Sequence, residues 1–389
     1  GKCCVSGAGD IVVDYAKRNF SVNGTIIKEG DWISLNGSTG EVYLGKVETE
    51  DATLDEDFTA IMNLAEKYTR MYVRTNADTP KDARKARDFG AKGVGLCRTE
   101  HMFFEGHRID AMREMILSDT VEGRRDALNK ILPMQRGDFE GILEAMNGLG
   151  VTIRLLDPPL HEFTPNEPAS QQYMAQKLGI PVERIKEKVD ALHEFNPMLG
   201  HRGCRLGVTY PEITEMQARA IIEAACNLKL RGLDPRPEIM VPLVGTVKEL
   251  KQQAEIINRV AAMVFEEKGV KVDYKVGTMI EIPRAAITAD QIAEVAEFFS
   301  FGTNDLTQMT FGYSRDDAGK FLPEYIRKGI LKTDPFAVLD QEGVGRLVEM
   351  GVKLGRKTNA DLKVGICGEH GGEPSSVIFC DSVGMNYVS

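Results

Sequence analysis

Features that would mark a membrane-spanning or nucleic-acid-binding protein are scarce in this sequence. Its 389 residues contain no apolar run long enough to span a bilayer, no internal repeat and no low-complexity tract. The formal net charge of −10 argues against nucleic acid or an anionic membrane as a general partner. An acidic chain that handles an anionic substrate must therefore concentrate its arginines locally.

Zinc-ligand spacing and a disulfide framework are also missing. The seven cysteines are scattered and odd in number, a pattern that favours a reducing, cytoplasmic location. A plastid stays open, because a transit peptide would lie upstream of the first residue. Residues 1–7 lack an initiating methionine and are typical of a strand and a turn, so the sequence is interpreted as a fragment.

Residues 1–50 are predicted to form a small β-rich segment. They are rich in glycine, valine and turn signals such as Asn23-Gly24 and Asn36-Gly37. Asn-Gly turns between alternating residues are typical of β-hairpins. The segment is too short to form a core of its own. Residues 51–70 are interpreted as a linker and a helix, because an acidic run is followed there by helical spacing.

From residue 71 onward, short apolar runs alternate with long helical patterns, which indicates βα units. Eight runs are expected as strands: 71–75, 93–97, 151–155, 239–244, 276–282, 298–301, 362–367 and 385–389. Eight such units over about 320 residues predict an α/β fold, a (β/α)8 TIM-type barrel over residues 71–389 with long loops. The sequence stops at the eighth strand, so the helix that normally follows is expected to be missing.

Two of the predicted strands end in a carboxylate. One apolar run ends at Glu281, and Pro283 blocks its continuation. The next strand leads directly to Asp305. Because barrels carry their chemistry where strands end, both acids are expected on neighbouring strand ends of one face. Such a pair suits Mg²⁺, which fills its other positions with substrate oxygens and water. The alternative is two solvated loop acids.

Three arginines are expected on the same face. Arg98 ends the second strand, Arg154 lies in the third, and Arg202 lies in the long loop before the fourth. An arginine in an apolar strand is costly to bury without an anionic partner. Each could pair with a neighbouring carboxylate, but three beside a metal pair favour a phosphate-bearing ligand. Arg315 is interpreted as a further carboxylate contact or as a surface charge.

Cysteine and histidine side chains offer one candidate for proton transfer. A buried cysteine is usually inert packing, and Cys97 is interpreted in that way. Cys367 stands at a strand end between glycines, where it could be packing or could act as a general acid or base. The histidines His101, His201 and His370 lie near the predicted site and are interpreted as groups that orient their neighbours.

Five motifs together resemble the phosphoenolpyruvate-utilising enzymes. They are GLCRTE at 95–100, NPMLGHR at 196–202, IEIP at 280–283, GTNDLTQ at 302–308 and CGE at 367–369. The family includes the pyruvate phosphate dikinases, phosphoenolpyruvate synthase and enzyme I of the sugar phosphotransferase system. LNGSTGEV at 35–42, RTEHMFF at 98–104 and GICGEHGG at 365–372 are most similar to the dikinases. The resemblance covers essentially the whole chain.

The resemblance implies a barrel that binds pyruvate or phosphoenolpyruvate. In the family, arginines matching Arg98, Arg154 and Arg202 hold the phosphoryl group, and Arg98 and Arg154 are assigned to catalysis as well. Acids matching Glu281 and Asp305 bind Mg²⁺, which bridges the substrate. All five residues are therefore expected to contact the substrate directly or through the metal.

The remaining assignments also come from the resemblance. Gly302, Thr303, Asn304 and Arg315 are assigned to substrate binding, and Asn304 and Arg315 match residues near the phosphate and carboxylate. Cys367 matches the acid/base that exchanges a proton at the methyl carbon of the pyruvate enolate. Making phosphoenolpyruvate requires such a group, because a methyl carbon next to a carbonyl must lose a proton.

For the chain as a whole, the resemblance implies part of a dikinase that converts ATP, phosphate and pyruvate into AMP, diphosphate and phosphoenolpyruvate. Residues 1–50 are then the remnant of the swivelling phosphohistidine domain. The carrier histidine and the ATP-binding region are absent, so this chain alone is expected to lack the full reaction. Family members commonly form homodimers through the barrel. The alternatives are an enzyme like phosphoenolpyruvate synthase, or a non-catalytic module that binds phosphoenolpyruvate and mediates dimerisation.

Overall fold

The structure is a computed structural model that describes residues 5, 8–37, 39–49, 56–104 and 108–389. It divides into two compact units, Gly1–Lys67 and Tyr68–Ser389. Residues 51–55 of the expected linker and helix lie outside the described residues, as do residues 1–4 and 6–7 of the opening segment.

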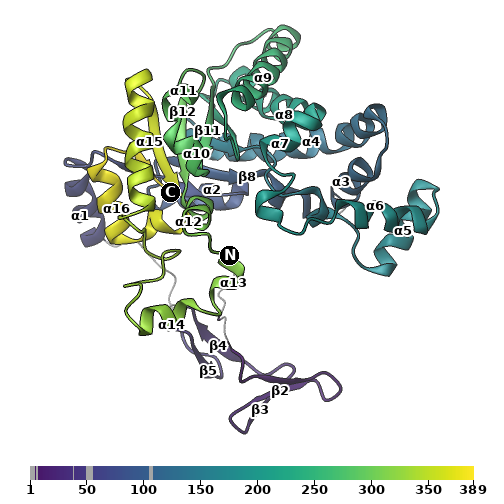
Figure 1. Cartoon of the computed structure of the whole chain (residues 1–389), viewed down its shortest axis with the longest axis vertical. Helices are drawn as coiled ribbons and strands as arrows, with labels where there is room; N and C mark the ends of the chain where they lie inside the picture. The colour runs from purple at the N-terminus through teal and green to yellow at the C-terminus, as the bar shows by residue number, and fades with distance from the viewer. Residues whose placement is uncertain (1–4, 6–7, 38, 50–55, 105–107) are drawn as a thin grey trace. The chain divides into compact units, whose positions relative to one another are not determined.

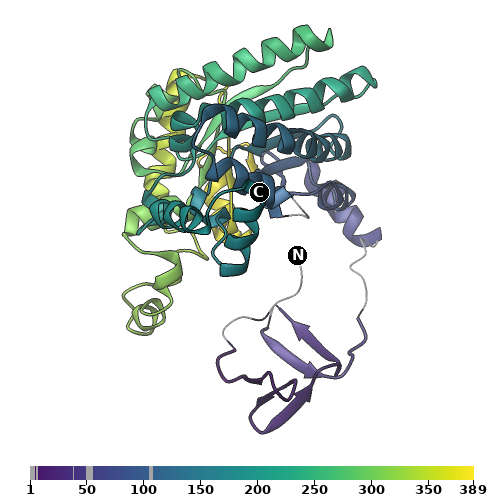
Figure 2. The ribbon, with the colours of Figure 1, turned by 90° about the vertical axis from the view of Figure 1, so that its right-hand side faces the viewer.

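The first unit contains the predicted hairpins. Strands β1 (Val12–Asp14), β2 (Asn19–Val22) and β3 (Thr25–Lys28) form an antiparallel sheet, and β4 (Ile33–Asn36) pairs with β5 (Glu41–Leu44) (Figure 2). Asn23 and Gly24 both have positive φ, as a two-residue hairpin turn requires. Helix α1 (Glu56–Glu66) follows. Among the described residues of this unit, Ile27 alone is a buried apolar side chain, so the unit has no substantial core.

The second unit is a closed, all-parallel barrel. The sheet order is β6-β14-β13-β12-β11-β10-β9-β8-β7, where β6 (Tyr72–Val73) and β7 (Thr75–Asn76) are two halves of one strand interrupted at Arg74. The half-strand β6 pairs with β14 and β7 pairs with β8, so the sheet closes on itself. The other strands are β8 (Gly93–Arg98), β9 (Gly150–Arg154), β10 (Arg236–Val241), β11 (Lys275–Ile280), β12 (Phe298–Gly302), β13 (Lys363–Cys367) and β14 (Tyr387–Val388). This confirms the predicted (β/α)8 barrel.

The strand bounds differ from the prediction by a few residues. The fourth strand begins at Arg236 and ends at Val241, whereas the apolar run predicted 239–244. The next residue is Pro242, which has no N–H to donate to a sheet ladder. The last strand is also shorter than its apolar run. Apolar content therefore marks where a strand lies in the sequence better than it marks the strand's ends.

Helices surround the barrel, and other helical segments follow the ends of its strands (Figure 1). The outer helices are α2 (Pro80–Asp88), α4 (Val121–Ala145), α8 (Pro211–Leu230), α9 (Val247–Lys268), α10 (Pro283–Ile287), α11 (Ala289–Ile292), α15 (Val344–Thr358) and α16 (Pro374–Ser382). The segments that follow strand ends are η1 (Thr99–Phe104), α3 (Arg108–Leu117), η2 (Leu160–Phe163), α5 (Pro168–Leu178), α6 (Val182–Leu192), η3 (Pro197–Leu199), α7 (Cys204–Thr209), α12 (Thr303–Phe311), α13 (Arg315–Ala318), α14 (Leu322–Arg327) and η4 (Glu369–Gly372).

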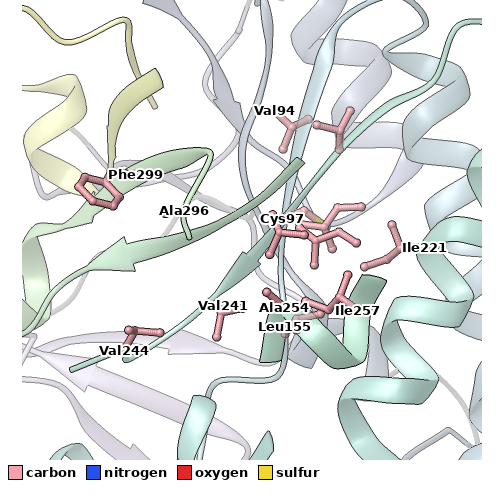
Figure 3. Close-up of a cluster of buried hydrophobic side chains, with 14 of the residues drawn as sticks. Val94, Cys97, Leu155, Ile221, Val241, Val244, Ala254, Ile257, Ala296 and Phe299 are labelled. Carbon is pink, nitrogen blue, oxygen red and sulfur yellow. The ribbon is translucent and has the colours of Figure 1, made fainter. Parts of the chain in front are cut away.

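The main core lies between the outside of the barrel and the helices. Figure 3 shows Val94 and Cys97 of β8 near Ile221 of α8 and Ile257 of α9, within one buried apolar cluster. Cys97 is fully buried there, which agrees with its interpretation as packing. Successive side chains of a strand point to opposite faces of the sheet. The neighbouring residue, Leu96, therefore lies in a second apolar cluster, together with residues from four other strands.

A buried ion network lies at the amino-terminal end of the strands. One carboxylate oxygen of Glu238 lies 2.8 Å from Nη1 of Arg74, and the other pairs with Lys363. The hydroxyl of Thr152 donates to Glu238 at 2.7 Å, and the guanidinium of Arg74 lies 4.4 Å from the ring centre of Tyr387. Arg74 is the residue that interrupts the first strand, so the network joins the closing strand to the rest of the barrel.

The Glu238→Gln variant is expected to lose about 3–5 kcal/mol of unfolding free energy near pH 7, because two buried cations lose their charged partner. Burial alone would raise the pKa of Glu238, but Lys363 and Arg74 lower it to about 2 from the usual 4.5. A carboxylate with a depressed pKa stabilises the fold fully above pH 4.5, and this contribution is lost as the pH falls towards 2.

Urea denaturation of the wild type and the variant near pH 7 and near pH 3 measures this effect. The difference in unfolding free energy between the two proteins should be smaller at the lower pH. A matched control is Glu349→Gln, where a half-exposed acid pairs with Lys353 one helical turn away, and the change should stay below about 0.5 kcal/mol. An equal difference in unfolding free energy at both pH values would contradict the conclusion that the charge of Glu238 stabilises the fold.

Candidate active site

Two buried arginines meet at the carboxyl ends of the strands. Arg154, the last residue of β9, lies with Nη1 2.8 Å from Oδ2 of Asp157, and its Nη2 pairs with Glu100. Nη2 of Arg202 lies 2.8 Å from the same oxygen of Asp157 and 3.2 Å from Oδ2 of Asp305. Asp157 thus bridges the two guanidinium groups, and the structure brings Arg154, Arg202 and Asp305 together.

Arg98 stands beside this cluster. It ends β8 and is paired in register with Arg154 of β9. Its backbone N–H donates to Oδ1 of Asp78 at 2.7 Å, and Nη1 of its side chain is 3.8 Å from Oδ2. Nδ1 of His101 contacts that second oxygen at 2.7 Å. Asp78 therefore holds the end of β8 in place, while the guanidinium of Arg98 makes no close ion pair with it.

The two carboxylates predicted as metal ligands lie on adjacent strands. Glu281 directly follows β11, and Asp305 lies in the first turn of α12, directly after β12. Glu281 is 2% exposed, and its Oε1 accepts a hydrogen bond of 2.6 Å from the backbone N–H of Leu243. Burial, together with the negative charges of Asp305 and Asp157, raises the pKa of Glu281 well above its usual range.

Glycine is required at position 302 for this arrangement. A Cβ atom on Gly302 would lie 2.6 Å from Oε2 of Glu281 and 2.5 Å from Cε of Met279. Real side chains essentially never approach so closely. Gly302 therefore acts by leaving space for the Glu281 carboxylate.

The residues present fit a divalent cation. Arg154 and Arg202 face the carboxylates of Glu100, Asp157, Glu281 and Asp305, so acids outnumber arginines in the buried cluster. Burial also raises the pKa of Asp305, so the charged form of this carboxylate is costly to bury and a bound cation would offset that cost. Glu281 and Asp305 would hold Mg²⁺ as oxygen ligands. Among the described residues no cluster of three or more His, Cys, Asp or Glu forms a complete metal site, so water and substrate would supply the remaining ligands.

Several buried polar atoms in the cluster have no hydrogen-bond partner. Within the described chain they are Arg154 Nε, Arg202 Nε, Asp157 Oδ1, Glu100 Oε2 and Asn304 Oδ1. Buried polar atoms are nearly always paired, so such a group of orphans points to a missing ligand. Two of them are guanidinium donors, which suit the oxygens of an anion. The arginines thus do pair with neighbouring carboxylates, as the sequence left open, but they also keep donors for a ligand.

Cys367 lies inside the barrel at the end of β13. It is 3% exposed, it belongs to the interior cluster with Met279, and its Sγ lies 3.8 Å from the carbonyl oxygen of Phe301. Burial raises the pKa of its thiol, and the hydrogen bond with Ser300 and the positive charges of Arg154 and Arg98 oppose this only in part. The group is therefore a neutral thiol in the ligand-free protein.

Arg315 lies outside the buried cluster. Its guanidinium pairs with Glu369, and its backbone N–H donates to Oε1 of Gln308 at 2.7 Å. The side chain is 38% exposed. The structure thus places Arg315 next to the turn that follows β13, at the rim of the strand ends.

Comparison with known proteins bears directly on this site. Residues 53–389 match the PEP-binding domain of the PEP-utilising enzymes. The chain belongs to this family. It is 58% identical over 390 residues to "Pyruvate, phosphate dikinase" of Clostridium symbiosum and 56% over 389 residues to the protein of the same name from Giardia intestinalis. It is also 58% identical over 392 residues to "Pyruvate, phosphate dikinase, chloroplastic" of Flaveria pringlei. These matches cover 100% of this chain but only 45%, 44% and 41% of the relatives, so the chain spans less than half of their length.

Membership of the PEP-utilising family confirms the resemblance inferred from the motifs. It also agrees with the closed barrel, because the five motifs that carry the family resemblance all lie in the second unit. No described helix of this family member is long and apolar enough to cross a membrane.

Three acids in this PEP-utilising barrel have structural roles that the sequence did not assign. Asp78, Glu100 and Asp157 follow the first, second and third strands; Asp78 contacts Arg98, Glu100 contacts Arg154, and Asp157 contacts both Arg154 and Arg202. The signal that could have found them is their position, because each lies within a few residues of a strand end. Sequence position, however, does not tell which acid pairs with which arginine.

Proposed function

We propose that this chain carries the pyruvate and phosphoenolpyruvate site of a pyruvate, phosphate dikinase. The observation that supports it best is the buried cluster in which Glu281 and Asp305 lie beside Arg154 and Arg202, with unpaired donors on both arginines. The names of the relatives and the matched PEP-binding domain support the same reaction class.

The proposed reaction is phosphoryl transfer between a phosphohistidine and pyruvate. Towards phosphoenolpyruvate, the P–N bond of the phosphohistidine breaks, a P–O bond forms to the enolate oxygen, and a methyl proton leaves the substrate. Arg98, Arg154 and Arg202 would bind and orient the phosphoryl group, since guanidinium groups match phosphate oxygens and neutralise their charge. Bound Mg²⁺ would supply Lewis-acid stabilisation of the negative charge on the enolate oxygen.

Cys367 is the proposed proton donor and acceptor. As a neutral thiol inside the barrel, it is ready to protonate the methylene carbon when phosphoenolpyruvate returns to pyruvate. In the opposite direction the thiolate must accept the proton, and the nearby charges of Arg154 and Arg98 favour that form. Burial keeps water away from the reactive carbon in both directions.

The rest of the chain has a proposed place in a larger protein. Residues 1–50 would be the end of the phosphohistidine domain, residues 51–70 the linker and helix, and residues 71–389 the substrate barrel. The full reaction with ATP and phosphate is then proposed for the larger protein, since these 389 residues cover only 41–45% of the length of the relatives. Dimerisation through the barrel is proposed from the family resemblance alone. The five described cysteines are free and buried, which supports a reducing compartment such as the cytosol or a plastid.

Proton exchange at the methyl carbon of pyruvate tests the proposed function. The 389-residue chain in D₂O is expected to replace the methyl protons of pyruvate with deuterium, as followed by proton NMR, when Mg²⁺ is present. Addition of a chelator should return the rate to that of protein-free solution. Absence of exchange in a chain that still binds phosphoenolpyruvate would contradict catalysis and favour the non-catalytic binding module.

A further inference from the structure

The turn after β13 is tied at three points to the long segment that follows β12. His370 in η4 is completely buried, with Nδ1 2.6 Å from Oγ1 of Thr303 and Nε2 2.9 Å from the carbonyl oxygen of Pro335. Its neighbour Glu369 pairs with Arg315. In Figure 1 the part of this segment with α13 and α14 extends away from the barrel, so these contacts lie at its attachment points.

The hydrogen-bond partners determine the roles of the two imidazole nitrogens. The carbonyl of Pro335 can only accept, so Nε2 of His370 carries the proton and donates. Nδ1 of the neutral ring then accepts from the hydroxyl of Thr303. Each nitrogen therefore contacts a different segment: Nδ1 contacts the first turn of α12, and Nε2 contacts the loop at Pro335.

Thr303 is the first residue of α12 and stands two positions before Asp305. The two strand ends are also paired directly, because β12 and β13 are in parallel register up to Gly302 and Cys367. The first residue of η4 lies two positions after Cys367. A bond from this turn to Thr303 thus connects the strand end that carries the thiol to the one that carries the amide and the carboxylate.

We propose that His370 is a positioning residue, which acts through its Nδ1 bond to Thr303 to hold Asn304 and Asp305 in register with Cys367. The proposal deepens the proposed function of this site and rests on it for the catalytic readout. The bond from Nε2 to Pro335 anchors the outer segment and contributes to stability. The two bonds of one ring therefore have separable consequences.

Two substitutions in the 389-residue chain separate the positioning effect of His370 from its contribution to stability. In His370→Asn the side-chain Oδ1 occupies the place of Nδ1 and can still accept from Thr303, while the bond to Pro335 is lost. In His370→Gln the Nε2 amide can still donate to Pro335, while the bond to Thr303 is lost. Both variants lose one hydrogen bond and part of the ring's packing, so similar falls in thermal unfolding temperature are expected.

The catalytic readout is the Mg²⁺-dependent exchange of pyruvate methyl protons. His370→Gln is expected to slow it by about 10- to 100-fold, the usual effect of losing a group that orients a ligand residue, whereas His370→Asn should retain a rate much closer to wild type. A purely structural role predicts equal losses in the two variants, and that result would overturn the proposal.

The second readout does not depend on catalysis. Hydrogen–deuterium exchange of the backbone amides in residues 303–308 should rise in His370→Gln and stay near the wild-type level in His370→Asn. If the wild-type chain shows no pyruvate exchange, the proposed function fails, but amide protection still decides the positioning role. Should a His370 variant not fold, Thr303→Val and Thr303→Ser replace the pair, since only the serine keeps the hydroxyl. Equal amide protection in the valine and serine variants would overturn the proposal.

Discussion

The Cys367→Ala variant is expected to lose exchange of the pyruvate methyl protons by about 10²- to 10⁴-fold, the usual contribution of a positioned acid/base. Its Mg²⁺-dependent affinity for phosphoenolpyruvate should change little, because the arginines and carboxylates that would hold the ligand remain. Proton NMR in D₂O measures the first quantity and calorimetric titration the second. The contrast between the two is the expected signature of a proton-transfer group.

A matched control is Cys380→Ala. Cys380 lies in α16, is fully buried in the outer core and, like Cys367, has a pKa raised by burial, to about 12. Its truncation should cost packing energy without slowing the exchange. If Cys367→Ala exchanges protons at the wild-type rate, the thiol is only packing, which is the alternative that the sequence left open. Loss of exchange in both variants would instead indicate a general packing defect.

The Glu281→Gln variant is expected to lose the Mg²⁺-dependent part of phosphoenolpyruvate binding. The substitution keeps the shape of the side chain and an oxygen that can accept from the N–H of Leu243, but it removes one of the two charges that would bind the cation. With Mg²⁺ present, calorimetric titration is expected to show a loss of about 10-fold or more in affinity for phosphoenolpyruvate. Without Mg²⁺, the affinity should not change. Stability should not fall, since ionising this buried carboxyl beside Asp305 and Asp157 is unfavourable.

The control for this prediction is Glu297→Gln, at the opposite end of the same pair of strands. Glu297 is exposed and accepts 2.8 Å from the backbone N–H of Val276, a bond that glutamine can also make. Its titration curves should match those of the wild type. Binding that needs no Mg²⁺ in any of the proteins would leave the arginines as a simple anion site and would remove Glu281 and Asp305 from the mechanism.

The barrel was predictable because its strands are buried on both faces. Such strands are near-continuous apolar runs, and the alternation of eight runs with helical patterns leaves few other architectures. The bounds were less predictable, since hydrogen bonding rather than apolarity ends a strand. The split of the first strand at Arg74 had no sequence signal, because it depends on a partner, Glu238, that lies far away in the chain.

For the site, the sequence could predict which residues lie at strand ends. Arg154, Arg202 and Asp305 meet in the structure, and Glu281 lies on the adjacent strand end, as the βα rule requires. Arg315 shows the limit of this rule, because its loop leads away from the strand and its guanidinium pairs with Glu369 at the rim. A residue thirteen positions beyond the strand end at Gly302 is no longer constrained by the strand.

The sequence alone therefore determined the barrel, the end of the strands at which the candidate site lies and the residue types available there, since these follow from local periodicity and from the geometry common to all parallel barrels. Only the tertiary structure decided which acid neutralises which arginine, which polar atoms stay unpaired, and that His370 joins two strand ends. The physical reason is that such pairings are short-range contacts between residues far apart in the chain. They depend on side-chain atoms that lie 2.6–2.8 Å apart, an arrangement that the local pattern of a sequence does not encode.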